Sequence, residues 1–342
     1  MFLGVDYYPE HWPLEFMKDD IERMKAMGVD TVRIGEFAWH LMEKQPGAYD
    51  FSFFDQAIKT LKKNGIQVMF GTPTATFPAW LAASFPNILS RDEAGVTKVF
   101  GGRRQYCFNS KDYLLHSLKL VEKLVSHYKD ETAIFSWQMD NELGHEGSDL
   151  CFCDQCKEAF QDFLKRKYKN IDALNEAWGT IFWGQTYNHF YEIPLPTKTV
   201  TSHNPSLRLD HARFRSHSVN EFTRAHVEII RKHKSASQLL TTNVSGGFFE
   251  KWFDHEENLS YMDIVSYDNY PVWGGLKEPM EPAKIAMTLD FARGLKRENF
   301  WIVEELIAAQ GHEIIGYRPK PGHAKLWSYQ AFAHGCNSML YF

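Results

Sequence analysis

Short runs rich in β-branched and aromatic residues alternate with helical patterns along the whole chain of 342 residues. This alternation is typical of βαβ units, in which a helix joins two parallel strands and covers the sheet. Eight such units close into a barrel, so the pattern predicts an α/β fold of the (β/α)₈ TIM-barrel type. The predicted strands are Phe2–Tyr8, Thr31–Phe37, Gln67–Thr72, Ala133–Met139, Leu239–Val244, Met262–Tyr267, Phe300–Val303 and Ser338–Phe342.

Helices are predicted between these strands from apolar residues that recur every three or four positions. In the first connection the repeat is formed by Met17, Ile21, Met24 and Met27, and Gly28 supplies a stop. Similar repeats precede the third, fourth and seventh strands. This order of elements matches the unit from which a parallel barrel is built.

The chain shows no internal repeat, low-complexity segment or clear interdomain linker, so we predict one catalytic barrel domain over residues 1–342. Long loops follow strands three, four and five, and extra helices are expected between about 144 and 210. The sequence stops at Phe342, at the end of the eighth strand. We therefore expect the front part of a longer polypeptide, truncated before helix 8 and any C-terminal domains.

Charge and hydropathy narrow the class of partner. The formal net charge of −5 arises from interspersed acids and bases without a basic block, which argues against nucleic acid or an anionic membrane as a partner. The first residues lack the basic and apolar regions of a signal peptide, and no run of eighteen apolar residues occurs. These features predict a cytoplasmic protein.

Four of the five cysteines fall into one constellation, in which Cys151, Cys153 and Cys156 are closely spaced and Cys107 comes from an earlier loop. A tetrahedral thiolate site needs four sulfurs that converge on one point, and Zn²⁺ is its usual occupant. The alternative is a set of buried free thiols. The polar surroundings of the cysteines favour a structural zinc, whereas Cys336 lies in an apolar stretch and is predicted to be a buried thiol.

Two strand ends carry a glutamate in an otherwise apolar context. Glu142 follows the fourth strand and Glu304 follows the seventh, so both are expected at the mouth where barrel active sites lie. Hydrolysis of a glycosidic bond needs one carboxylic acid and one carboxylate, and a separation of roughly 5 Å selects the retaining route. Asn141, directly before Glu142, could donate to a sugar hydroxyl.

Arg33 lies at the end of the second predicted strand, and its guanidinium group is expected near these acids. Arg33 is expected to pair with Glu304 and keep it ionised, although a structural ion pair with Glu36 is the alternative. The other carboxyl, Glu142, is expected to have its pKa raised so that it can act as the acid.

Four further residues suit a sugar site. Arg103 and Arg104 are tethered to Cys107, so at least one of them should be held in place, although solvated loop charges are the alternative. Trp183 and Tyr270 lie in loops or at strand ends, where an aromatic ring can stack on the apolar face of a pyranose, although a place in the core is the alternative that the residues alone leave open.

Six stretches together resemble glycoside hydrolase family 42, the β-galactosidases. They span nearly the whole chain in order. They are Tyr7-Tyr-Pro-Glu-His-Trp12, Arg33-Ile-Gly-Glu-Phe-Ala-Trp39, Gly102-Arg-Arg-Gln-Tyr-Cys107, Trp137-Gln-Met-Asp-Asn-Glu142, Tyr267-Asp-Asn-Tyr-Pro271 and Phe300-Trp-Ile-Val-Glu304.

The resemblance implies a retaining double displacement that releases terminal β-D-galactose from small oligosaccharides, with Glu142 as acid/base and Glu304 as nucleophile. It implies a structural zinc on the four cysteines and a homotrimer for the full-length protein. It also implies galactose contacts from Arg103, Asn141, Trp183 and Tyr270. Glu305 stands next to Glu304 and is the alternative nucleophile.

Three other functions remain open from the residues. An α-L-arabinopyranosidase would accept a sugar whose ring hydroxyls resemble those of galactose. A zinc hydrolase would need an open coordination position, which four cysteine ligands do not leave. A non-catalytic carbohydrate-binding fragment is the third, because an acid and a histidine of the family's sugar site would lie past Phe342.

Overall fold

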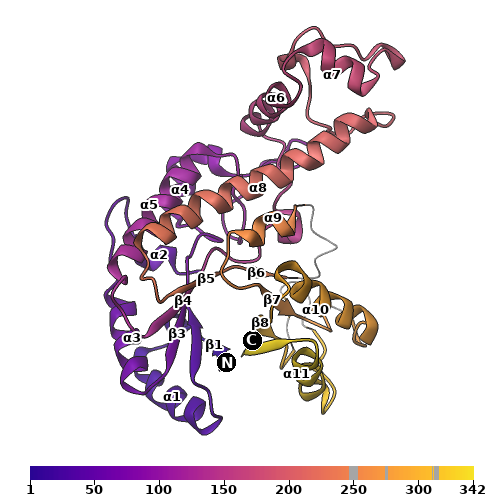
Figure 1. Ribbon diagram of the computed structural model, residues 1–342. Coiled ribbons are helices and arrows are strands. Elements are labelled where there is room, and N and C mark those ends of the chain that lie inside the picture. The colour runs from indigo at the N-terminus through magenta and orange to yellow at the C-terminus, as the bar shows by residue number, and fades with distance from the viewer. Residues whose placement is uncertain (246–252, 274–275, 310, 312–315) are drawn as a thin grey trace.

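The computed structural model describes residues 1–245, 253–273, 276–309, 311 and 316–342. Its centre is a single sheet in which every pairing of neighbouring strands is parallel. Figure 1 shows helices around this sheet, with the two chain ends beside each other. The strands are β1 (Leu3–Asp6), β2 (Thr31–Ile34), β3 (Gln67–Gly71), β4 (Ile134–Gln138), β5 (Leu239–Thr241), β6 (Asn243–Val244), β7 (Ser266–Asn269), β8 (Phe300–Glu305) and β9 (Cys336–Tyr341).

The strand order closes the sheet into a barrel. It runs β5-β4-β3-β2-β1-β9-β8-β7-β6, and the two outer members are separated in the chain only by Thr242. The fifth predicted strand is therefore a single stretch whose first half pairs with β4 and whose second half pairs with β7. The predicted (β/α)₈ TIM barrel is confirmed.

The predicted helices occupy the expected connections on the outside of the barrel. In α1 the side chains of Met17, Ile21 and Met24 are buried, as their spacing predicts, but Met27 lies just beyond the helix and is 62% exposed. The helices are α1 (Met17–Ala26), α2 (Trp39–Met42), α3 (Ser52–Lys63), α4 (Ala79–Ser84), α5 (Lys111–His127), α8 (Pro205–His233), α9 (His255–Ser260), α10 (Pro282–Lys296) and α11 (His323–Ala333).

One strand is displaced from its predicted position. The sixth was expected over Met262–Tyr267, whereas β7 covers Ser266–Asn269. Met262 and Val265 are buried, so the apolar pattern there reflects packing of the approach to the strand. The displacement brings Asp268 and Asn269 into the sheet, and both take part in the site described below.

A lobe projects from the barrel mouth and contains α6 (Asp154–Tyr168), α7 (Ile171–Trp178) and the first part of α8 (Figure 1). It has its own apolar cluster, which includes Phe160, Leu164, Leu174 and Phe214 together with the four cysteines. The long helix α8 then returns to the barrel, where it packs against α5. The lobe accounts for the extra helices expected between 144 and 210.

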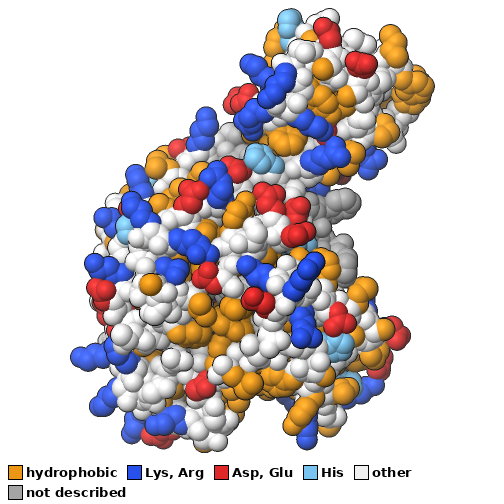
Figure 2. Space-filling view, viewed as in Figure 1, with side chains coloured by type: hydrophobic (Ala, Val, Ile, Leu, Met, Phe, Trp, Pro, Cys, Tyr) orange, Lys and Arg blue, Asp and Glu red, His pale blue; other side chains and the backbone are white. Residues whose placement is uncertain are grey.

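The surface carries charges of both signs. Figure 2 shows basic and acidic side chains interspersed over the face in view. Among the described helices, none is both long enough and apolar enough to span a bilayer.

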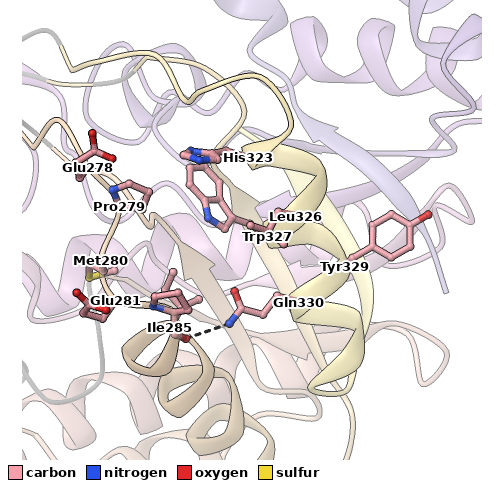
Figure 3. A pocket seen from close by; sticks show the side chains of 11 residues that line it. Glu278, Pro279, Met280, Glu281, Ile285, His323, Leu326, Trp327, Tyr329 and Gln330 are labelled. Atoms are coloured by element: carbon pink, nitrogen blue, oxygen red, sulfur yellow. Dashed lines mark hydrogen bonds between the residues drawn. The ribbon is translucent and has the colours of Figure 1, made fainter.

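Beside the last strand, the outer face of α11 is partly uncovered. Leu326 is 59% exposed, Tyr329 65% and Phe332 41%. A cavity of about 700 Å³ lies between this helix and the segment that leads into α10 (Figure 3). Gln330 donates a 3.1 Å hydrogen bond across it to the carbonyl oxygen of Pro282.

Candidate active site

Polar side chains converge where the barrel strands end. The candidate site draws Arg33 from β2, Glu142 from just after β4, Asn243 from β6, Asp268 from β7 and Glu304 from β8. All of these side chains are buried, although they lie beside the mouth of the barrel. Parallel strands present their carboxyl ends at the same edge, so the fold itself gathers residues that are far apart in the sequence.

Glu304 is held by three donors. The guanidinium of Arg33 contacts its Oε1 at 2.6 Å, the Tyr270 hydroxyl donates to Oε2 at 2.5 Å, and the Asn243 amide donates to Oε1 at 3.3 Å. The same guanidinium also contacts Glu36 at 3.2 Å and Asp6 at 2.9 Å. The two pairings that the sequence offered for Arg33 therefore coexist.

Glu305 lies in a different environment from its neighbour. Its carboxyl group accepts hydrogen bonds from Asn269 at 3.0 and 3.2 Å and is fully buried. The described partners of Glu304 and Glu305 differ, so the two carboxyl groups lie in separate surroundings. The contacts to Arg33 and Tyr270 belong to Glu304 alone.

Glu142 contacts two guanidinium groups. Arg103 and Arg104 approach its Oε2 at 2.9 and 3.1 Å, and the amide of Asn141 donates to the same oxygen at 3.3 Å. Both arginines also contact Glu146, at 3.4 and 2.9 Å. Neither arginine is a free loop charge, and the side chain of Arg104 is only 1% exposed.

Three carboxyl groups share this small space. Glu142, Asp268 and Glu304 each offer an oxygen, and these oxygens lie within 4.8 Å of one another. In retaining glycosidases the two catalytic carboxyl groups lie roughly 5–5.5 Å apart, which leaves no room for a water molecule between them. The distances here are of that size. Asp268 accepts a 2.8 Å bond from Asn243 through Oδ2, while its buried Oδ1 has no hydrogen-bond partner among the described residues.

The charges around the two glutamates reverse an expectation from the sequence. Burial raises the pKa of Glu142, but Arg104 and then Arg103 outweigh it and lower that pKa to about 2. Burial raises the pKa of Glu304, and Arg33 offsets this only in part because Glu142 lies nearby. Without a bound sugar, Glu142 therefore ionises more readily than Glu304. The sequence had led us to expect the opposite order. The reason for the observed order is that two arginines contact Glu142, whereas the single guanidinium group of Arg33 contacts three carboxylates, those of Asp6, Glu36 and Glu304.

The backbone is held in an unusual conformation around Glu142. Asp140, Glu142, Arg104 and Glu146 all have positive φ angles, between 51° and 58°. Residues with a Cβ adopt this left-handed region at an energetic cost, and the surrounding contacts must offset it. Asp140 is fixed by donors from Thr74 at 2.6 Å and from Tyr106 at 3.2 Å.

Asn243 connects these parts. Its Oδ1 accepts from the Glu142 backbone N–H at 3.0 Å, and its Nδ2 donates to Asn141, Asp268 and Glu304. Asn243, Asp268 and Glu146 were not among the site residues expected from the sequence. The one signal that could have found the first two is a polar residue at the carboxyl end of a predicted strand.

Of the five sugar-site and supporting residues expected from the sequence, the structure brings four together around Glu142 and Glu304, namely Arg33, Arg103, Asn141 and Tyr270. Trp183 is placed elsewhere. It follows α7 in the lobe, is 67% exposed, and its described ring contact is a stack on Phe182 at 4.7 Å.

The sulfur atoms of Cys107, Cys151, Cys153 and Cys156 lie within 4.8 Å of one another. That of Cys107 is 3.3 Å from Cys156 and 3.6 Å from Cys153. A tetrahedral Zn²⁺ with bonds of about 2.3 Å would hold sulfurs slightly less than 4 Å apart, so these four residues fit the ion. Backbone N–H groups of Asn109 and Arg91 point at two of the sulfurs, as expected around thiolates.

A (β/α)₈ barrel with paired, buried glutamates at its strand ends is the arrangement of a glycoside hydrolase. A family model described as Beta-galactosidase, that of glycoside hydrolase family 42, matches residues 6–342. The chain belongs to glycoside hydrolase family 42.

Individual relatives agree with this assignment. The β-galactosidase BgaA of a Thermus species is 40% identical over 99% of this chain and 54% of its own length. The solved structure of a β-galactosidase from Halorubrum lacusprofundi is 36% identical, with a TM-score of 0.94 over all of this chain and 52% of its own. That of a Marinomonas β-galactosidase gives 0.93, also at 36% identity, over 100% and 54%. The chain thus spans about half the length of the curated relatives it matches.

Proposed function

We propose that this chain carries the catalytic centre of a retaining β-galactosidase that releases terminal β-D-galactose from small oligosaccharides. The observation that carries the proposal is the close approach of Glu142 and Glu304, of which one carboxyl oxygen each lies within 4.8 Å of the other, at the strand ends of a family 42 barrel. An inverting enzyme needs a gap of roughly 6.5–9.5 Å for its water.

Glu304 is the nucleophile in this proposal. Its carboxylate attacks the anomeric carbon while Glu142 gives its proton to the departing glycosidic oxygen. In the second step Glu142 takes a proton from water, which attacks the same carbon and releases galactose from Glu304. Arg33 and Tyr270 orient Glu304 through the contacts given above and offset the charge that returns to it when galactose leaves.

The two glutamates share one proton in the state that reacts. The arginines beside Glu142 favour the form in which Glu304 holds that proton, so the productive form, with the proton on Glu142, is the minor one. Arg103 is the more exposed of the two arginines, and we assign it with Asn141 to the sugar hydroxyls. As Arg103 turns to a sugar, Glu142 loses one compensating charge and becomes easier to protonate.

Two further assignments concern the whole protein. The four cysteines hold a structural Zn²⁺ that joins the lobe to the segment before α5, and their reduced state suits a cytoplasmic location. The full-length protein forms a homotrimer. Ile181, Phe182 and Trp183 are 86%, 61% and 67% exposed, an apolar surface that contact between copies would cover.

The test of this function is a panel of chromogenic glycosides offered to the chain. Hydrolysis of the β-galactoside above the α-L-arabinopyranoside, with the β-anomer of galactose released first, is the expected result. A preference for the arabinopyranoside would reassign the substrate. Binding of galactose without turnover of any glycoside would leave a carbohydrate-binding module and contradict the proposal.

A further inference from the structure

Four charged groups form a closed cluster at one side of the candidate site. Arg103 and Arg104 each contact Oε2 of Glu142 and each also contact Glu146. The pairings run at 2.9 and 3.1 Å toward Glu142, and at 3.4 and 2.9 Å toward Glu146. Two carboxylates therefore compete for the same two cations.

The two carboxylates differ in their surroundings. The side chain of Glu142 is 4% exposed, whereas that of Glu146 is 45% exposed. Glu146 lies in the turn His145–Gly147 with a left-handed φ of 55°, a conformation that has an energetic cost, and its carboxylate contacts both arginines.

We propose that Glu146 is a positioning residue that draws Arg103 and Arg104 partly away from Glu142, so that Glu142 can carry the proton needed by the leaving group. This inference rests on the proposed function, in which Glu142 is the acid. Without Glu146, both guanidinium groups would compensate the charge of Glu142 alone and would hold it as a carboxylate.

The remaining groups around Glu142 come from four parts of the barrel. His145 precedes Glu146 in the same turn, and Ser245 follows β6. Asp268 on β7 and Glu304 on β8 are acids whose proximity favours protonation of Glu142. Asn141 and Asn243 contribute neutral amide contacts. Glu146 is thus the acid that acts on Glu142 through the arginines and not by direct contact across the barrel.

Leaving-group dependence provides the test. Glu146→Gln removes the charge and keeps the shape, and Glu22→Gln on the exposed face of α1 is the matched control. An alkyl galactoside needs a proton on its leaving oxygen, whereas a dinitrophenyl galactoside does not. We expect Glu146→Gln to lower kcat/KM for the alkyl substrate by about tenfold, one pKa unit, and to leave the dinitrophenyl substrate nearly unchanged. Glu146→Asp should restore part of the loss.

A second readout does not depend on turnover. In protein carrying ¹³C-labelled glutamate and saturated with galactose, so that Arg103 is turned to the sugar, the side-chain resonance of Glu142, assigned with Glu142→Gln, should titrate at lower pH in Glu146→Gln than in the wild type. Equal losses on both substrates, or an unchanged titration, would overturn the inference. If the wild type hydrolysed neither galactoside, the proposed function would fail, and the titration would still decide whether Glu146 acts on Glu142.

Discussion

Glu304 and Glu305 are adjacent at the end of β8, yet their carboxyl groups have different partners. Glu304 contacts Arg33 and Tyr270, whereas Glu305 is enclosed with Asn269 as its hydrogen-bond donor. Burial raises the pKa of Glu305 to about 8, and the bonds from Asn269 offset only part of the rise. Glu305 is therefore protonated and neutral below about pH 8. A neutral carboxyl group suits a structural role better than that of a nucleophile.

This assignment has a consequence for stability. Because the pKa of Glu305 is higher in the folded than in the unfolded chain, its contribution is fully present below about pH 4 and is lost as pH rises toward 8. Between pH 5 and pH 8, Glu305→Gln should gain stability relative to the wild type, on the order of 3 kcal/mol. Urea unfolding at the two pH values measures it, with Glu22→Gln as the control. A constant difference between variant and wild type would show that Glu305 is already ionised when buried.

Sequence reasoning reached some residues of the site and missed others for physical reasons. The ion pair between Arg33 and Glu304 could be predicted from the sequence, because the carboxyl ends of the strands converge at the mouth of a barrel. Asp268 was not recognised, because the sixth strand was predicted to end at Tyr267 whereas β7 continues through Asn269. The ionisation of Glu142 was also out of reach. It depends on two arginines and on Glu146, which come together only when the loops after β3 and β4 meet.

At the scale of elements, the helices and strands agree with the apolar pattern of the sequence wherever burial of apolar side chains determines their position. Ile285, Leu289 and Ala292 repeat at helical spacing and are all buried in α10. The sequence gives no indication that the fifth strand is interrupted at Thr242, because the pattern over Leu239–Val244 predicts one continuous strand. Closure of the barrel imposes that break, since the first half must pair with β4 and the second with β7.

The cysteine cluster joins separate elements, so its loss should act on folding. Cys107 precedes α5, while Cys153 directly precedes α6 and Cys156 lies in its first turn. Cys153→Ser should lower both the bound zinc and the Tm and leave the pH dependence of turnover unchanged. Cys336→Ser, a buried cysteine outside the cluster, is the control and should retain the metal. A shift of the pH profile by one unit or more in Cys153→Ser would point to zinc-bound water in the reaction.

For the whole molecule, one exposed apolar surface lies on α11, apart from that of the lobe. Leu326, Tyr329 and Phe332 are exposed there, close to the exposed Ile307. Apolar patches of this kind promote association of a chain in solution. We expect the chain to bind a hydrophobic dye and to self-associate, and Leu326→Lys combined with Tyr329→Lys to reduce both. Met27→Lys, at an exposed site outside this patch, is the control. Dye binding that is equal in all three proteins would contradict a role for this surface.

The roles of the two glutamates at the centre of the barrel can be measured directly with azide as an external nucleophile. Glu304→Ala cannot form the covalent intermediate, so azide should attack the activated galactoside itself and give α-galactosyl azide. Glu142→Ala still forms the intermediate on Glu304, and azide should then give the β-azide. This pair of products is the result that a retaining mechanism on Glu142 and Glu304 predicts. An α-azide from Glu305→Ala, with Glu304→Ala behaving as the wild type, would contradict it and move the nucleophile by one residue.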